Sequence, residues 1–85
     1  MIILSQSKEE LVNLDNAAHV FLEELKPFGE YEIMVSLGGR REVVSIGRYK
    51  DKSSAKNVLR QLSNCVNKDI FKMPDYDGER SMDDV

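Results

Sequence analysis

The chain has 85 residues, which suffice for one domain with a small core, and its formal net charge at pH 7 is −3. Three Phe, three Tyr and no Trp leave few rings for the base stacking on which many nucleic-acid binders depend. The single cysteine, Cys65, excludes an internal disulfide, and no apolar run approaches the roughly 20 residues of a membrane span. We therefore expect a cytoplasmic protein that contacts no membrane.

The first 26 residues fit two structures. The first is a series of short strands separated by turns whose polar side chains bond to the backbone, with strands at residues 2–6, 11–14 and 19–24. The second is one helix over residues 7–26, begun by a Ser-x-x-Glu capping box at residues 7–10 and apolar along one side. Asn13, Asp15 and Asn16 are poor helix formers, which favours the strands but leaves both structures open.

A β-hairpin follows. Apolar and polar residues alternate over residues 31–37, which is the period of a half-buried strand. Gly38 and Gly39 can adopt the positive φ of a tight turn, and a second strand returns over residues 41–49. Gly47 lies inside this second strand, where a glycine predicts a bulge or the close approach of another group to the backbone.

The clearest predicted element is a helix over residues 52–67. Asp51 is a favourable N-cap, and the apolar residues that follow it have the helical period, at Ala55, Val58, Leu59, Leu62, Cys65 and Val66. A short last strand at residues 70–73 is ended by Pro74. Residues 75–85 contain five acids and little to bury, so they are predicted to be a flexible tail.

These elements predict an α+β fold. Residues 1–74 form a single domain, in which an antiparallel sheet of about five strands is covered on one face by the helix at residues 52–67. The sheet is the only surface against which the apolar side of that helix can pack. Because the tail is predicted to contact nothing, cutting the chain after Pro74 is expected to cost almost no stability.

Short motifs spread over residues 1–74 support this fold. They read Met1-Ile2-Ile3-Leu4-Ser5-Gln6, Val12-Asn13-Leu14-Asp15-Asn16, Ile46-Gly47-Arg48-Tyr49, Ala55, Val58-Leu59 and Phe71-Lys72-Met73-Pro74. In these motifs the chain resembles small uncharacterised proteins of Gram-positive bacteria and their phages or mobile elements. The resemblance implies a strand at residues 17–24, which tend to be β-branched in that group, and a phage or mobile-element origin. It implies no activity.

No set of residues predicts catalysis. His19 is the only histidine, and no residue at a recognised spacing from it would complete an acid–base or nucleophilic pair. Cys65 lies on the apolar side of the predicted helix, where a buried structural thiol is expected rather than a reactive one. We expect no enzyme, no metal and no cofactor.

One charged segment stands out. Residues 1–39 have a net charge of −5 and residues 40–60 a net charge of +5. Clustered Lys and Arg can bind phosphate groups, so the candidate contacts for an anion or nucleic acid are Arg40, Arg41, Arg48, Lys50, Lys52, Lys56 and Arg60. Two functions follow, a non-catalytic accessory or protein-interaction module and, as the alternative, a weak nucleic-acid-binding protein.

The same charges predict self-association. An acidic and a basic segment of equal and opposite charge can pair between two copies. The predicted strand at Met1–Gln6 is apolar and contains no Lys or Pro, so it would be an unprotected strand at a sheet edge. We expect a homo-oligomer in addition to any other protein partner.

Overall fold

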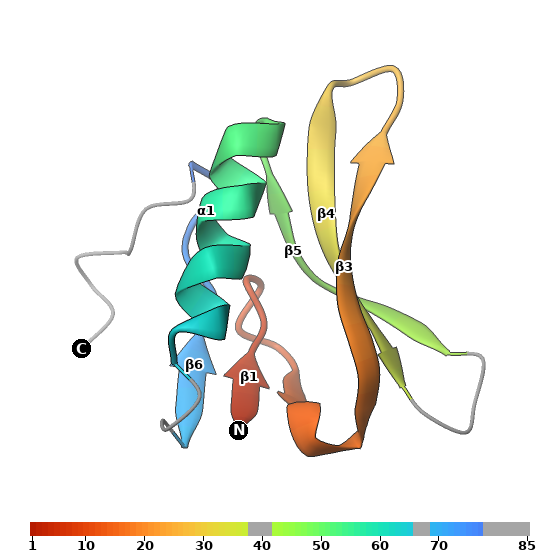
Figure 1. Ribbon diagram of the computed structural model, residues 1–85. Coiled ribbons are helices and arrows are strands. Elements are labelled where there is room, and N and C mark those ends of the chain that lie inside the picture. The colour runs from red at the N-terminus through yellow and green to blue at the C-terminus, as the bar shows by residue number, and fades with distance from the viewer. Residues whose placement is uncertain (38–41, 66–68, 78–85) are drawn as a thin grey trace.

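A computed structural model describes residues 1–37, 42–65 and 69–77. Within these ranges the chain forms two three-stranded sheets and one helix, which confirms the α+β class. Figure 1 shows helix α1 alongside the short strands, while β3 and β4 form a long twisted hairpin on the other side of the molecule.

The small sheet has the order β2-β1-β6, from β1 (Ile2–Leu4), β2 (Leu11–Asn13) and β6 (Ile70–Lys72). β1 is the central strand, antiparallel to β2 and parallel to β6. Ile3, Val12 and Phe71 lie opposite one another in this register, and all three are buried. One face of the small sheet is therefore part of the core.

The large sheet has the order β3-β4-β5 and is antiparallel throughout, from β3 (Ala17–Leu25), β4 (Glu30–Leu37) and β5 (Val43–Tyr49). A 3-10 helix, η1 (Leu14–Asn16), joins it to the small sheet. On β4 the alternation predicted from the sequence is observed, because Ile33 and Val35 are fully buried between less buried neighbours. The glycines predicted to form the β4–β5 turn lie outside the described residues.

Gly47 has both of the roles predicted for it. The β4–β5 register shifts between the pairs Ile33–Gly47 and Met34–Ser45, which leaves Ile46 as the extra residue of a bulge. A Cβ at Gly47 would lie 2.8 Å from the hydroxyl oxygen of Tyr49, so any larger residue would force the buried Tyr49 ring to move. Because of the bulge, Ile46 and Tyr49 both face the core although they are three residues apart.

Helix α1 (Lys52–Ser63) begins where the sequence predicted. The Asp51 carboxylate accepts a hydrogen bond of 2.8 Å from the Ser54 backbone N–H, and this bond lowers the pKa of Asp51. The helix ends at Ser63, four residues before the predicted end. Its apolar side packs mainly against β4 and β5, with Ala55, Val58 and Leu62 buried.

Gln6 links the two sheets. Its backbone N–H donates to the Ile46 carbonyl at 2.9 Å, and its side-chain amide bonds to both backbone groups of Arg48. The amide NH₂ donates to the Arg48 carbonyl at 2.8 Å, and the amide oxygen accepts from the Arg48 N–H at 2.9 Å. The side chain thus bonds to the outer edge of β5 as a peptide group of a fourth strand would.

Residues 74–76 extend this closure of the β5 edge. The Tyr49 hydroxyl donates to the Pro74 carbonyl at 3.0 Å, and the Lys50 N–H donates to the Tyr76 carbonyl at 3.2 Å. The Tyr76 hydroxyl also donates to a carboxylate oxygen of Glu30. The part of the predicted tail that the structure describes is therefore bonded to the domain, and residues 78–85 lie outside the described residues.

Two sequence-based expectations about the sheet are wrong. The strands do not form one antiparallel sheet of about five strands, because β6 pairs with β1 in parallel and forms a separate sheet with β1 and β2. The strand predicted at Met1–Gln6 is not a sheet edge, since β1 has a partner on each side.

Residues 7–26 form strands rather than one helix, as the poor helix formers indicated.

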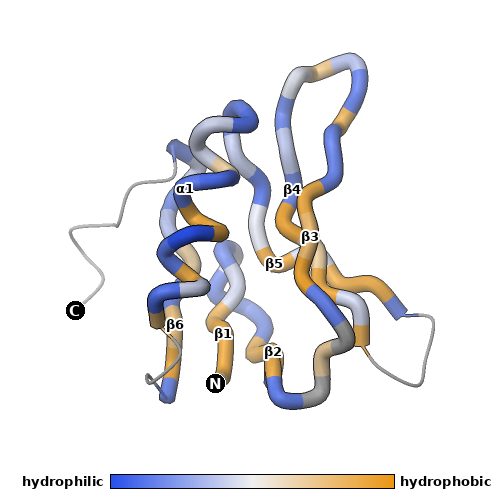
Figure 2. Tube along the Cα trace, viewed as in Figure 1, coloured by the Kyte–Doolittle hydropathy of each residue, from blue (hydrophilic) through white to orange (hydrophobic). Residues whose placement is uncertain are grey.

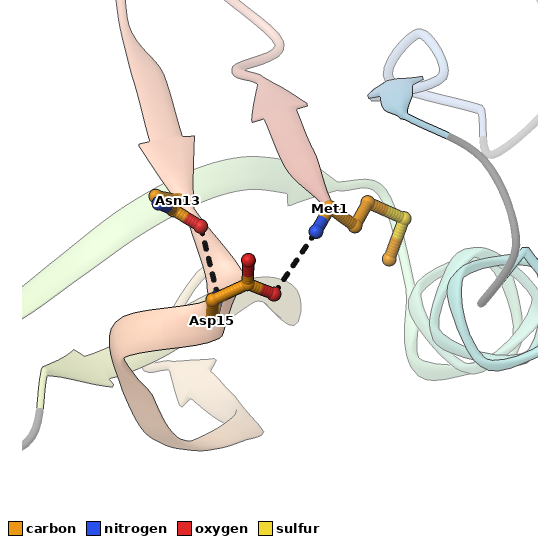
Figure 3. A network of polar contacts seen from close by, with 3 residues as sticks. All are labelled: Met1, Asn13 and Asp15. Carbon is orange, nitrogen blue, oxygen red and sulfur yellow. Dashed lines mark hydrogen bonds and ion pairs between the residues drawn. The ribbon is translucent and has the colours of Figure 1, made fainter.

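The beginning of β1 is held to the turn before β3. The N-terminal ammonium of Met1 forms an ion pair of 3.1 Å with a carboxylate oxygen of Asp15 (Figure 3). The Asp15 backbone N–H in turn donates to the side-chain oxygen of Asn13 at 3.0 Å, which caps η1. The residues that made a helix unfavourable here are those that form the turn.

Candidate functional site

The strongest candidate surface is the solvent-facing side of the small sheet. Opposite the buried row of Ile3, Val12 and Phe71, the three strands present a face with four apolar side chains, which we call the apolar β1 face, formed by Ile2, Leu4, Leu11 and Ile70. Six large hydrophobic side chains of the described residues are exposed, and three of the six belong to this face. Their exposed fractions are 36% for Ile2, 67% for Leu11 and 53% for Ile70.

The register makes this face continuous. Leu4 lies directly opposite Leu11 on β2, and Ile2 lies directly opposite Ile70 on β6. Asn13 and Lys72 complete the two rows and form its polar border. Figure 2 shows that β1 and β6 are hydrophobic over most of their length, which is unusual for strands with one face in solvent.

The sequence carries one signal for this face. Ile2, Ile3 and Leu4 are apolar in succession, and a strand that is apolar on both sides is typical of one that is covered on both sides. The expected edge strand is instead the central strand of the sheet, and Ile2 on its second face is 36% exposed. The contributions of Leu11 and Ile70 depend on long-range pairing, which local sequence does not reveal.

A second candidate lies along helix α1. Lys52, Lys56 and Arg60 are spaced four residues apart, so they lie on the same side of the helix. They line an open cleft of about 750 Å³, whose wall also includes Asp77. Arg60 donates to the Asn57 side-chain oxygen at 2.9 Å, and neither Lys52 nor Lys56 forms an ion pair with a described residue. The helix thus gathers three of the seven predicted basic contacts.

The other basic candidates that the structure describes, Arg48 and Lys50, are not part of this cleft. Arg48 is exposed on the solvent side of β5, where it lies opposite Glu32 of β4. Lys50 is exposed between β5 and α1, and its backbone is bonded to Tyr76. Arg40 and Arg41 lie outside the described residues. The structure therefore divides the predicted basic site into a group of three on the helix and separate residues elsewhere.

Three tyrosines have raised pKa values. Burial raises the pKa of Tyr49 far above its ordinary value, and the nearby Asp75 carboxylate contributes. The hydrogen bond to Glu30 raises the pKa of Tyr76, which is solvent-exposed. For Tyr31, desolvation raises the pKa, and Glu24 adds to this. All three hydroxyls are protonated at neutral pH, so they act as hydrogen-bond donors rather than as bases.

The two residues considered for catalysis lie apart in the fold. His19 is exposed on β3, where its ring stacks on Phe21 with 4.9 Å between ring centroids. Cys65 is half-buried and packs against the core, but it follows the helix rather than lying on its apolar side. Among residues 1–37, 42–65 and 69–77, no group of three or more His, Cys, Asp or Glu side chains is placed to hold a metal ion.

In the part of the chain that the structure describes, no helix has the length and apolar character needed to cross a bilayer. Three comparisons of the chain, with protein-family models, with curated proteins and with solved structures, found no match.

Proposed function

We propose that this chain is a non-catalytic protein-interaction module that binds an amphipathic helix of a partner protein on the apolar β1 face. The observation that carries the proposal is the exposure of Leu11 and Ile70 on the same side of a three-stranded sheet. Each exposed leucine or isoleucine side chain gives up about 1.5–3 kcal/mol of hydrophobic stabilisation relative to burial. Contact with an apolar partner surface recovers this energy.

The shape of the face supports a helix as the occupant. Three strands about 4.8 Å apart, each three residues long with a rise of about 3.3 Å, cover an area of about 10 Å by 10 Å. One turn or two of an α-helix, about 10 Å in diameter, cover the same area. A helix packed on a sheet is also how this chain covers its large sheet, with α1 against β4 and β5.

The second candidate function, weak nucleic-acid binding, is supported by the alignment of Lys52, Lys56 and Arg60 in one cleft. Three cations can neutralise about three phosphates, which gives weak and strongly salt-dependent binding. No aromatic side chain of the described residues lines this cleft, so base stacking is not expected to add to the electrostatic attraction. For this reason we rank it below protein binding.

Origin and location complete the proposal. We place the protein in the cytoplasm, where a lone thiol such as Cys65 is kept reduced. Its resemblance to small proteins of Gram-positive bacteria points to a phage or mobile element as the source. These statements, like the absence of catalysis, stay predictions.

The test begins with capture of binding proteins from a lysate of the source organism, identification by mass spectrometry and titration of the purified partner. Leu11→Lys/Ile70→Lys should weaken the affinity at least about 100-fold, because two anchoring contacts worth about 2 kcal/mol each are lost. Val43→Lys is the matched control, since Val43 is also exposed but belongs to the large sheet.

The outcomes separate the two functions. Binding by the Leu11→Lys/Ile70→Lys variant with unchanged affinity would contradict the proposal. Loss of binding in Lys52→Glu/Lys56→Glu, with a steep dependence on salt and a mobility shift of added nucleic acid, would instead support the helix cleft.

A further inference from the structure

The two edges of the large sheet differ in how their backbones are used. At β5 the outward backbone groups of Ile46, Arg48 and Lys50 are bonded to Gln6 and Tyr76. At β3 the only strand partner is β4, and no described residue beyond β4 is bonded to the backbone of residues 19–24. β3 is nine residues long and contains no Lys, Arg or Pro, and its two charged residues, Glu23 and Glu24, both lie near its end.

Two polar side chains of β3 also lack a hydrogen-bond or ion-pair partner among the described residues of one chain. Glu23 lies directly opposite Glu32, a like charge, while Glu32 accepts a hydrogen bond from the Ser45 hydroxyl and lies opposite Arg48. Among the described residues neither Glu23 nor His19 has a hydrogen bond or an ion pair. A basic group placed opposite Glu23 would relieve the repulsion between the two carboxylates.

We propose that two copies of this chain pair through β3, antiparallel and related by a two-fold axis at Phe21, to form a continuous six-stranded sheet. In this register His19 of one copy lies opposite Glu23 of the other, twice by symmetry. Val20 lies opposite Leu22, and Phe21 lies opposite Phe21. The imidazole of His19 donates a hydrogen bond to the carboxylate, and every other directly opposed pair in this stretch is apolar.

Other registers place unfavourable pairs together. A two-fold axis normal to the sheet puts directly opposed residues on the same face, so the axis must pass through a residue rather than between two. An axis at Leu22 would put Phe21 opposite Glu23, and an axis at Glu23 would put two carboxylates together. An axis at Val20 would include the register irregularity between Ala17 and His19. Of these four registers, only the axis at Phe21 places a hydrogen-bond donor opposite a carboxylate and apolar side chains opposite apolar ones.

The solvent face of the large sheet gains contacts in the same arrangement. The stacked rings of His19 and Phe21 show that both side chains lie on one face. Met34 is directly opposite Phe21 on β4 and is only half-buried in one chain. Across the axis the row becomes Met34, Phe21, Phe21 and Met34, so the two aromatic rings are covered from both sides.

The other elements leave room for this pairing. Helix α1 packs mainly against β4 and β5, and the small sheet is joined to the large one at the β5 edge through Gln6. Figure 1 shows β3 on the side of the molecule away from α1 and β6. The bulk of each copy therefore lies away from the axis.

The test is the mass of the full-length chain in sedimentation equilibrium from about 1 to about 300 μM, a range that resolves a micromolar dissociation constant. The wild type should approach twice 9.7 kDa. His19→Glu puts two carboxylates opposite one another, and Glu23→Lys removes the acceptor opposite His19, so each should raise the dissociation constant about tenfold. His19→Glu/Glu23→Lys puts an ion pair across the axis and should restore the wild-type value.

Two controls make the test decisive. Glu9→Lys has the same change in net charge as Glu23→Lys but lies in the exposed loop between β1 and β2, so it should leave the dissociation constant unchanged. Circular dichroism of each variant verifies the fold. A monomeric wild type at the highest concentration would overturn the inference, and so would failure of the double substitution to restore pairing. A dimer that is lost in Leu11→Lys/Ile70→Lys would place the contact on the apolar β1 face instead.

Discussion

The two edges of the large sheet face the same physical problem and differ in its solution. An edge strand presents unpaired N–H and C=O groups, which are costly to bury and prone to pair with other chains. β5 is closed from within the chain by the side-chain amide of Gln6 and by the backbone of Tyr76, over residues that are far apart in the sequence. β3 has no such cover among the described residues, and so it is available for a second chain.

The comparison shows how a small domain can replace a missing strand. A glutamine amide carries one acceptor and two donors, so it can bond to the N–H and C=O of one residue as a neighbouring peptide would. Gln6 does this for Arg48 directly after the Ile46–Gly47 bulge, where β5 bends. One side chain thereby closes the edge that a longer β1 would otherwise have to cover.

The largest expected effect is a loss of stability when a core side chain beside one of the two edges is shortened. Ile46→Ala, at a side chain that is 1% exposed beside β5, should lower the free energy of unfolding by about 3 kcal/mol through the cavity it leaves. Val20→Ala, at a half-buried position on β3, should lower it by about 1 kcal/mol. Urea denaturation of the two variants measures both values. Equal losses would show that the β3 side of the sheet is as firmly packed as the β5 side.

The next effect concerns Tyr49, which holds Pro74 against β5. Tyr49→Phe leaves the buried Pro74 carbonyl with only the longer hydrogen bond, 3.4 Å, from the side-chain amide of Gln6 and should cost about 1–2 kcal/mol. Thermal denaturation at neutral pH measures the loss. A variant as stable as the wild type would show that water replaces the hydroxyl and that this contact does not hold the segment.

The raised pKa of Tyr49 also makes stability depend on pH. Its pKa is raised in the folded chain, so between the unfolded pKa, about 10, and the higher folded pKa the folded state binds more protons than the unfolded state. The contribution of the Tyr49 hydroxyl to stability is therefore fully present below pH 10 and is lost as the pH rises above it. Denaturation between pH 8 and pH 12 should show this decline in the wild type and a shallower one in Tyr49→Phe. Parallel curves would remove Tyr49 as the cause.

Gln6 gives a somewhat smaller effect. Gln6→Ala removes both bonds of the side chain to Arg48 and should lower the free energy of unfolding by about 1 kcal/mol or slightly more, since these groups are exposed enough to bind water. Gln6→Glu keeps an acceptor for the Arg48 N–H but loses the donor to its carbonyl, so its stability should lie between those of the wild type and Gln6→Ala. If both variants match the wild type, the amide does not close the edge.

The smallest effect is that of the C-terminal segment. Cutting after Pro74 removes the bonds of Tyr76 to Lys50 and Glu30 and should cost about 1 kcal/mol, slightly more than the sequence predicted. Cutting after Asp77 keeps these bonds and should cost nothing measurable. The difference between the melting temperatures of the two truncated chains measures the contribution of Tyr76. Identical melting temperatures would mean that Tyr76 does not contribute to stability.

Local patterns in the sequence predicted local structure well. The N-cap at Asp51, the alternation on β4 and the special position of Gly47 each follow from a few neighbouring residues, and each is observed. The division into two sheets does not follow from neighbouring residues, because it depends on the pairing of β6 with β1, which are separated by most of the chain. Parallel pairing of two three-residue strands leaves no periodic signal that could be recognised beforehand.

The candidate surfaces were predicted less well than the elements. The basic residues were found by composition, but only the helical period places three of them together, and the separation of Arg48 from that group depends on the fold. Gln6 lies in one of the short motifs, but an isolated polar residue has no local feature that marks it as a substitute for a strand. The apolar β1 face requires the register of all three strands.

Amide hydrogen exchange at low and at high protein concentration tests the difference between the two edges most directly. We expect the amides of Arg48 on β5 and of Lys50 directly after it to be protected at both concentrations, because Gln6 and Tyr76 accept their hydrogen bonds within one chain. We expect the outward amides of β3 to exchange quickly at low concentration and to become protected at high concentration. Rapid exchange at Arg48 and Lys50, or β3 amides that are equally protected at both concentrations, would contradict these expectations.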